Sequence, residues 1–217
     1  MIKIEKTEVF GWEAAIRGMR NPMNSWDKSD SGYVITNKDD YELGYDPIYE
    51  LEVGNNDLKL MKSLSKAGSD HGKFLRMINV TADLTAPLYW WKEFDTYKVG
   101  TVANSCSTMH KIHTKEFTLD DFSTDHLIDF SWNRLADLIE YLNICRQKFL
   151  DTDDKDWWWQ MIQLLPSSYN QKRTVQLNYQ VLKAMYFARK EHKLDEWRNF
   201  CKWCEELPYF KEICIEI

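Results

Sequence analysis

Residues 131–150 constrain the fold more than any other stretch, because their apolar side chains recur at the spacing of an amphipathic helix. These apolar positions are Trp132, Leu135, Leu138, Ile139, Leu142 and Cys145. Side chains spaced by three and four residues share one face of a helix, and that face has to be buried. The face is larger than one small domain requires, which favours a homo-oligomer.

The rest of the chain has more expected helices than expected strands. Three-and-four spacing predicts helices over residues 11–20, 57–67, 83–97, 153–165, 175–192 and 194–206. Pro87 would lie in the first turn of its helix, where a missing amide donor costs little. Alternating side chains predict strands over residues 2–9 and 74–81. No internal repeat is present, so we expect a single α+β domain over residues 1–217.

Residues 21–56 interrupt this pattern with a segment rich in Asn, Asp, Ser and Gly. Two short runs within it, residues 33–35 and 49–53, predict hairpin strands. The segment is therefore expected to be an enlarged loop or hairpin excursion. Its four tyrosines could line a ligand, but the preferred interpretation is that they pin the loop to the body of the domain. They are Tyr33, Tyr41, Tyr45 and Tyr49.

Charge and hydropathy narrow the class of partner. The formal net charge is −6 and the pI is near 5.4, so the chain offers no basic field to a nucleic acid polymer. No run of about 18 apolar residues is present, and the first residues lack the pattern of a signal peptide. We therefore expect a soluble, cytoplasmic protein that does not bind a membrane.

The five cysteines fit a reducing compartment better than a disulfide framework. Cys201 and Cys204 form a CxxC pair, but no second pair stands at the spacing of a zinc site. Residues three apart on an amphipathic helix are ordinarily core positions, and this interpretation is preferred. His110 and His113, near His126, are interpreted as surface residues, so no metal site is predicted.

Gly-rich phosphate loops, the GxSxG elbow and the HExxH motif are all missing from the sequence. What remains is a polar and aromatic belt over residues 71–113, which includes Trp90, Trp91, Tyr97 and Lys98. Amides and hydroxyls can bind an anion, and aromatic rings can stack on a planar ligand. The belt therefore indicates either a nucleotide-sized pocket or a capped loop over a Trp-rich core.

The final fifty residues carry an ordered set of motifs. Leu165-Pro166 is followed twelve positions later by Asn178, and then by Arg189, His192 and Glu196-Trp197. This layout is similar to the flavin-dependent thymidylate synthase (ThyX) family, which reads L-P, twelve residues, N-x-R and then L-R-x-x-x-H-A-Q-x-E-I. Residues 14–20 also resemble the family's opening helix, and His71 stands where the family has the His of an H-x-x-P-F-E-H strand.

The central signature of the family, R-H-R-x-x-S-x-N-E-x-S-x-R-Y, aligns with residues 96–110. Four positions keep related chemistry, namely Lys98, Thr101, Asn104 and Ser107. The R-H-R triplet is replaced by Thr96-Tyr97-Lys98. Gln180 replaces the Arg of N-x-R, and Ile162 stands where the family has a phosphate-binding Arg. A charge-assisted hydrogen bond contributes about 1.5–3 kcal/mol, so these changes weaken phosphate binding unless other groups compensate.

The resemblance implies a ThyX-like fold, a small central antiparallel sheet with several long helices, in a homotetramer. It implies FAD as cofactor and a uridylate-type nucleotide as substrate. In the family, reduced flavin and methylenetetrahydrofolate deliver a methyl group to dUMP without an enzyme cysteine. The protein's task is then binding, orientation and electrostatics.

Residue by residue, the resemblance implies substrate binding by Arg189, Lys98 and Ser107. It implies cofactor binding by His71, Asn104, Asn178, Gln180 and His192. No catalytic residue is assigned. Asn178 and Arg189 are eleven residues apart, so we expect them on one face of a single helix. The first expected function is a flavin-dependent methyltransferase of the thymidylate synthase type, with a substrate that could be altered. The alternative is a catalytically lapsed ThyX-fold protein that binds a nucleotide or a protein partner.

Overall fold

The computed structural model describes residues 1–217, which form two compact units. The first unit contains residues 1–7, 81–176 and 189–200, and the second contains residues 8–80, 177–188 and 201–217. None of the helices combines the length and the apolar composition needed to span a bilayer.

A four-stranded sheet has the strand order β1 (Lys3–Phe10), β4 (Asn79–Pro87), β6 (Asn170–Asn178) and β5 (Val102–Ser105). Most residues of these strands belong to the first unit. Strand β5 pairs antiparallel with β6, with Val102 opposite Gln176 and Ser105 opposite Arg173. The strand predicted over residues 2–9 is confirmed by β1.

Strand β4 corrects two predictions. The strand expected over residues 74–81 begins only at Asn79, and residues 72–76 form the 3-10 helix η3 (Gly72–Arg76). The helix expected over residues 83–97 is a strand as far as Pro87 and becomes helix α4 (Leu88–Phe94) only afterwards. Burial alternates along β4, which is the period of a half-buried strand. Pro87 is extended and also disfavours helix at the residue before it, so the helix starts late.

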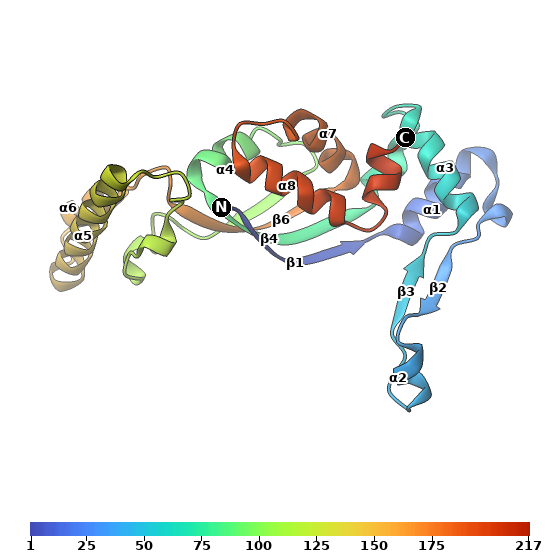
Figure 1. The fold of residues 1–217 in the computed structure, drawn as a ribbon, viewed down its shortest axis with the longest axis horizontal. Coiled ribbons are helices and arrows are strands. Elements are labelled where there is room, and N and C mark those ends of the chain that lie inside the picture. Colours follow the sequence, from blue (N-terminus) through green and yellow to red (C-terminus); the bar gives the residue numbers. More distant parts are fainter. The chain divides into compact units, whose positions relative to one another are not determined.

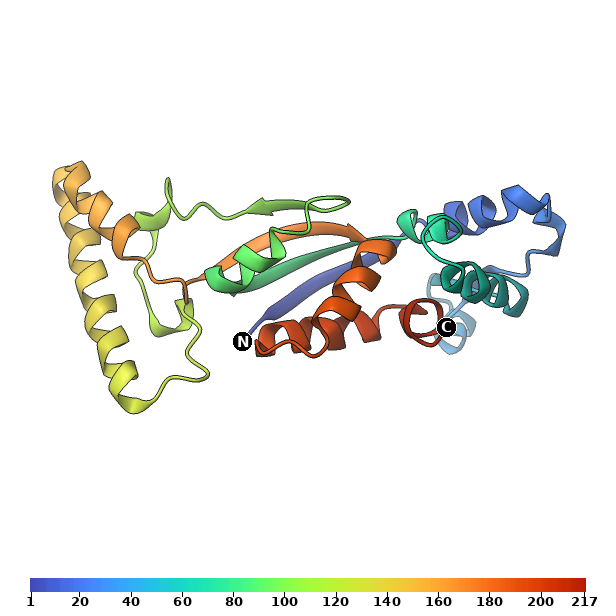
Figure 2. The same ribbon diagram turned by 90° about the horizontal axis from the view of Figure 1, so that it is seen from above.

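Helix α4 lies over one face of the sheet (Figures 1 and 2) and carries an aromatic core. Trp90 and Trp91 are fully buried, together with Phe94. The ring of Trp90 is 4.8 Å from that of Trp197, on helix α8 (Asp195–Glu206), and 5.8 Å from that of Phe200. The tryptophans of the belt are therefore core residues, as the second of the two interpretations of the belt expected.

The helix predicted over residues 175–192 is wrong in its first part. Strand β6 continues to Asn178, because Val175 and Leu177 are buried at the alternating spacing of a strand. Helix α7 (Tyr179–Arg189) follows directly. Asn178 and Arg189 therefore do not share the face of one helix. The side-chain oxygen of Asn178 instead accepts a hydrogen bond of 3.1 Å from the Val181 amide at the start of α7, as a helix cap does.

Helices α5 (Asp129–Thr152) and α6 (Lys155–Leu164) lie side by side in Figures 1 and 2 and confirm the predicted helices. Asp153 ends α5 in the left-handed conformation, and Asp154 caps α6 by accepting from the Asp156 amide. The two helices share a hydrophobic cluster with the 3-10 helices η4 (Ile112–Thr114) and η5 (Leu119–Asp121) and their flanks. Its buried members are Ile112, Phe117, Phe122, Leu135, Ile139, Leu142, Cys145 and Met161.

The second unit contains the predicted helices α1 (Trp12–Arg20) and α3 (Asn55–Lys66), with η3 and the π-helical turn η6 (Lys211–Ile215) packed on α3. Tyr179 lies in its core, where the ring contacts Trp12 and Phe210 at centroid distances of 5.5 and 5.2 Å. The chain enters α1 through Gly11, whose φ is +95°. A Cβ atom there would lie 2.1 Å from the Met77 carbonyl oxygen, so only glycine fits without a backbone shift.

After the 3-10 helices η1 (Asn21–Met23) and η2 (Trp26–Lys28), the excursion forms the predicted hairpin. Strands β2 (Gly32–Ile35) and β3 (Tyr49–Glu52) pair antiparallel, with the short helix α2 (Lys38–Glu42) at the tip. All four tyrosines of the excursion are exposed, between 48% and 67%. The expectation that they pin the loop to the body is therefore wrong for Tyr41, Tyr45 and Tyr49, whereas Tyr33 is hydrogen-bonded to Glu13 of α1.

The cysteines form no disulfide. Cys201 and Cys204 are buried on α8, which confirms the interpretation of the CxxC pair as core positions. Burial raises the pKa of Cys201 to about 11 and that of Cys214 to about 12. Cys106 is the one exposed cysteine.

Candidate functional site

Three donors of the first unit converge on one carboxylate, that of Glu93 near the end of α4. Glu93 Oε2 lies 2.8 Å from Arg189 Nη1, 3.0 Å from Trp197 Nε1 and 3.3 Å from His192 Nε2. Ionised acceptors with several donors form strong hydrogen bonds. We call Glu93, Arg189, His192 and Trp197 the Glu93 cluster.

The hydrogen bonds of His192 define its tautomer. Its Nδ1 accepts a hydrogen bond of 3.2 Å from the Leu194 amide. In a neutral ring the proton is therefore on Nε2, the atom that faces Glu93. Both ring nitrogens are engaged within the chain, so a ligand could contact the imidazole through Nε2 only by replacing Glu93.

Arg189 is held by aromatic rings as well as by charge. Its Nε donates to Tyr97 Oη at 2.9 Å, and its guanidinium lies 4.9 Å from the Trp197 ring centroid and 5.6 Å from that of Tyr97. A planar guanidinium stacks well on such rings, and this restricts its orientation. About 20% of the Arg189 side chain is exposed, so a ligand has partial access to it.

A pocket of about 300 Å³ lies beside this cluster. Its lining residues are Phe94, Asp95, Tyr97, Lys98, Thr101 and Ala103. Tyr97 belongs to both the pocket wall and the hydrogen-bond chain through Arg189. The carboxylate of Asp95 is paired with Arg173 at 2.7 Å, and Arg173 stacks on Trp91 at 4.1 Å. Lys98 also lines the pocket. Its side chain is exposed and, unlike that of Arg173, forms no ion pair with a carboxylate.

A buried carboxylate, that of Glu196, precedes Trp197 in the sequence of α8. Glu196 is 5% exposed and accepts a short hydrogen bond of 2.5 Å from Tyr89 Oη, which also lies 3.1 Å from Ser123 Oγ. Burial and the hydrogen bond to Glu196 raise the pKa of Tyr89 to about 12. Tyr89 therefore keeps its proton, and with it the hydrogen bond to Glu196, throughout the neutral range.

The structure brings together three of the residues that the sequence singled out in the first unit. Arg189 and His192 meet in the Glu93 cluster, and Lys98 lines the adjacent pocket. Asn104 lies opposite Thr174 on the exposed strand β5. Ser107 is exposed, and its hydroxyl accepts hydrogen bonds from the amides of Met109 and His110.

The other predicted cofactor residues belong to the second unit. His71 is exposed and precedes η3. Gln180 is half-buried, and its side-chain oxygen lies 3.8 Å from where a Cβ atom of Gly72 would be. The side-chain oxygen of Asn178 caps α7, and its side-chain nitrogen takes no part in the cap.

Comparison with known proteins places this arrangement on a known fold. No protein-family model and no curated protein sequence matches the chain. Solved structures do match, among them thymidylate synthase X (ThyX) from Helicobacter pylori with FAD and dUMP. That structure aligns with a TM-score of 0.68 and 14% identity over 100% of this chain and 98% of the other. The chain has the ThyX fold.

A second ThyX structure from Helicobacter pylori, also complexed with FAD and dUMP, gives a TM-score of 0.68. Its identity is 13%, over 99% of this chain and 98% of the other. The α+β prediction and the ThyX-like architecture are confirmed. At this identity the ThyX likeness concerns the fold alone.

Sequence reasoning missed Glu93. It lies 96 positions before Arg189, and a glutamate on a helix is ordinarily an exposed residue. The sequence contains only a weak indication of this contact: Glu93 and Tyr97 are four positions apart, so they can lie on the same side of a helix. Only the fold shows that both contact Arg189.

Proposed function

We propose that the chain is a diverged member of the ThyX family and acts as a flavin-dependent enzyme on a pyrimidine nucleotide. The proposed reaction is a one-carbon transfer of the thymidylate synthase type, with an altered ligand. One observation carries the proposal: Arg189 and His192, two residues of the C-terminal motif series, meet beside a pocket that Lys98 lines. The ThyX neighbours, which contain FAD and dUMP, support it through the fold.

The proposed substrate residues are Arg189, Lys98 and Ser107, and the proposed FAD residues are His71, Asn104, Asn178, Gln180 and His192. The side-chain amides among the proposed FAD residues offer donors and acceptors of the kind that the hydrogen-bonding edge of a flavin uses. The pyrophosphate has a poorer fit, because the arginines nearest the pocket, Arg189 and Arg173, are already paired with carboxylates. Bound flavin would supply the redox chemistry, and the chain would supply binding and orientation.

Glu93 explains how the ligand can differ from that of ThyX. Its carboxylate already takes the donors of Arg189, His192 and Trp197, and it places a negative charge where a ligand oxygen would otherwise bind. A like charge brought into this cluster is repelled. We therefore propose a ligand that is less anionic than dUMP, or that presents its phosphate to Lys98 instead.

The same observation supports the second function, a catalytically lapsed ThyX-fold protein that binds a nucleotide or a protein partner. In the Glu93 cluster, the donors of Arg189, His192 and Trp197 already have an acceptor in Glu93, so the cluster is stable without any ligand. We further propose a cytoplasmic homotetramer, supported by the apolar side chains that α5 leaves exposed. These include Phe130, Trp132, Tyr141, Ile144 and Leu150.

The test combines Glu93→Gln with calorimetry of dUMP and uridine. The variant keeps the shape of the side chain and removes its charge, so dUMP affinity should rise about tenfold or more, while uridine affinity changes little. Glu191→Gln is the control, because Glu191 is exposed and lies outside the cluster. Adding Arg189→Ala to the Glu93→Gln variant should abolish the gain.

The absorption spectrum of the purified protein separates the two functions. A flavin band in the natural protein supports the enzyme, and nucleotide binding without flavin supports the lapsed protein. If neither the natural protein nor Glu93→Gln binds any pyrimidine compound, a nucleotide site at this cluster is excluded.

A further inference from the structure

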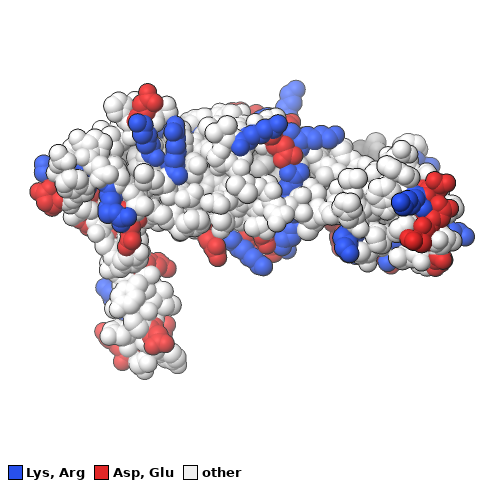
Figure 3. All heavy atoms as spheres, turned by 180° about the vertical axis from the view of Figure 1, so that it is seen from behind, with Lys and Arg blue, Asp and Glu red and all other residues white.

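The hairpin excursion carries the whole net charge of the chain. Residues 30–52, here called the arm, contain seven acidic residues and one lysine, a formal charge of −6. The whole chain also has −6, so all other residues together are neutral. The acidic residues are Asp30, Asp39, Asp40, Glu42, Asp46, Glu50 and Glu52. Figure 3 shows red side chains on the projecting hairpin.

The arm also exposes several large apolar side chains to solvent. Its exposed large side chains are Tyr33, Val34, Tyr41, Leu43, Tyr45, Ile48 and Tyr49, with Leu43 77% exposed. None of these contributes to a core of the arm itself. Exposed tyrosines grouped with other apolar residues are typical of protein interfaces.

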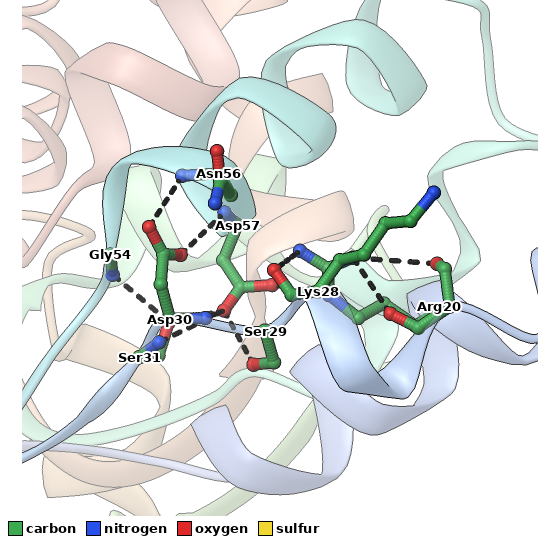
Figure 4. Close-up of polar contacts among 9 residues, drawn as sticks. Arg20, Lys28, Ser29, Asp30, Ser31, Gly54, Asn56 and Asp57 are labelled. Carbon is green, nitrogen blue, oxygen red and sulfur yellow. Dashed lines mark hydrogen bonds and ion pairs between the residues drawn. The ribbon is translucent and has the colours of Figure 1, made fainter.

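A buried network holds the base of the arm in place (Figure 4). Arg20 and Asp57 are almost completely buried and form an ion pair of 2.6 Å. The other carboxylate oxygen of Asp57 accepts from the hydroxyls of Ser29 and Ser31 at 2.7 and 2.6 Å, and from the amides of residues 30 and 31. Asp30 in turn accepts from the amides of Asn56 and Asp57.

The side chain of Asn37 helps to order the tip of the arm. Asn37 donates to the Asp46 carbonyl at 2.9 Å and accepts from the Ile48 amide at 2.7 Å, which joins the two flanks of α2. A two-stranded hairpin is marginal in water on its own. Order at both base and tip lowers the entropy that the arm would lose on binding.

A basic face follows the arm directly in the sequence. Residues 58–79, which include most of α3 and all of η3, carry five basic residues and one acidic residue. The basic residues are Lys59, Lys62, Lys66, Lys73 and Arg76. α3 and η3 pack on each other within the second unit, and Figure 1 shows the hairpin leading away from α3. The arm of one chain therefore cannot cover the basic face of the same chain.

We propose that the arm binds the basic face of α3 and η3 on a second copy of this chain. Acidic groups of the arm meet the lysines, and the exposed tyrosines bury against the apolar parts of the lysine side chains. Two copies can exchange arms reciprocally about a two-fold axis, so that the same contact forms twice.

This contact does not depend on nucleotide binding or on the proposed tetramer. A tetramer built on α5 would persist without the arm, whereas the arm contact would disappear. Failure of one proposal therefore leaves the other intact.

Charge exchange between the two surfaces tests the contact by sedimentation velocity. One variant reverses the arm (Asp39→Lys, Asp40→Lys and Glu42→Lys), and the other reverses the face (Lys59→Glu, Lys66→Glu and Lys73→Glu). Each variant alone should weaken the arm-dependent association at least tenfold. The arm variant removes the net charge of the arm, which goes from −6 to zero, and places lysines at its tip, and the face variant changes the face from +4 to −2. An equimolar mixture should recover the association, since each reversed arm meets a reversed face. The natural association should weaken between about 0.05 M and about 0.5 M salt.

Two further variants separate the contribution of the apolar side chains from that of net charge. Tyr41→Ser with Leu43→Ser and Tyr45→Ser keeps the charge of the arm and should still weaken association. Glu191→Lys with Glu206→Lys and Glu216→Lys changes the net charge equally at exposed sites elsewhere and should not. Circular dichroism verifies that each variant is folded. The proposal is overturned if the arm-reversed chain associates like the natural one, if the mixture gains nothing, or if the natural chain stays monomeric.

Discussion

Gly11 is the residue whose backbone leaves the least room for substitution. Its φ is +95°, and a Cβ atom would lie 2.1 Å from the carbonyl oxygen of Met77. Gly11→Ala should therefore lower the free energy of unfolding by more than about 2 kcal/mol, because backbone strain and a backbone clash add. Urea denaturation measures the loss.

Gly44→Ala is the matched control. Gly44 has nearly the same φ, +94°, but no atom would lie within 4 Å of its Cβ. This variant should lose only the strain of the left-handed backbone, about 1 kcal/mol. Equal losses in the two variants would show that the Met77 carbonyl moves aside at no cost.

Single residues also show where sequence reasoning about the site reached its limit. Arg189 and His192 were identified through a series of motifs that resembles the ThyX series in order, and Lys98 through one position of a partial match to the ThyX signature. The residues that contact Arg189 and His192 in the fold could not be predicted from these motifs. Contact between Glu93 and Arg189 spans 96 positions, and local spacing carries no information on such a pair.

At the scale of elements, amphipathic helices were predictable, whereas the boundaries of β4 and β6 with the helices that follow them were not. The predicted helices of α1, α3, α5, α6 and α8 are confirmed because their apolar faces repeat over several turns. Ala82, Leu84 and Ala86 of β4 have high helix propensity, and pairing within a sheet overrides it. The same applies to β6, where the predicted helix began four residues before α7 does.

The anchor of the arm leads to a prediction on pH. Burial alone would raise the pKa of Asp57, but hydrogen bonds from Ser31, Ser29 and Arg20 outweigh it and lower the pKa below the usual 3.8. The stabilisation is then fully present above about pH 3.8 and is lost as the pH falls through the lower folded-state pKa. A series of urea denaturations at decreasing pH should show this loss.

Asp57→Asn should remove that acid-dependent component and cost about 3–5 kcal/mol at neutral pH, because it leaves Arg20 buried without its counter-charge. Asp39→Asn is the control, since Asp39 is exposed on the tip of the arm and should change stability by less than about 0.5 kcal/mol. An Asp57→Asn protein as stable as the natural one would show that the ion pair contributes nothing beyond its desolvation.

At the scale of the whole molecule, the chain has the ThyX fold over its full length, but its sequence has few positive charges at the positions where the ThyX signature has them. In the comparison with the ThyX signature, Thr96, Tyr97 and Lys98 stand at the R-H-R positions, and Ile162 and Gln180 stand at two further positions where that family has arginine. Lys98 offers one point charge and lacks the bidentate fork of arginine. A thymidine-requiring strain that expresses the chain should therefore grow poorly or not at all without thymidine.

The control for complementation is the same strain with an ordinary thymidylate synthase. Robust growth with the natural chain would mean that the missing arginines are dispensable. Growth with Glu93→Gln alone would instead point to the internal carboxylate as the cause of the low activity.

The placement of the cysteines has a chemical consequence for the assembled protein. Four thiols are buried, and for each of them burial raises the pKa, so that thiolate, the form that oxidants attack, is scarce. Cys106 is exposed just beyond the end of β5 and has no neighbouring cysteine partner in its own chain. Under oxidising conditions the chain can therefore form a disulfide only with another molecule, and at most one link per copy keeps the product a covalent dimer instead of a network.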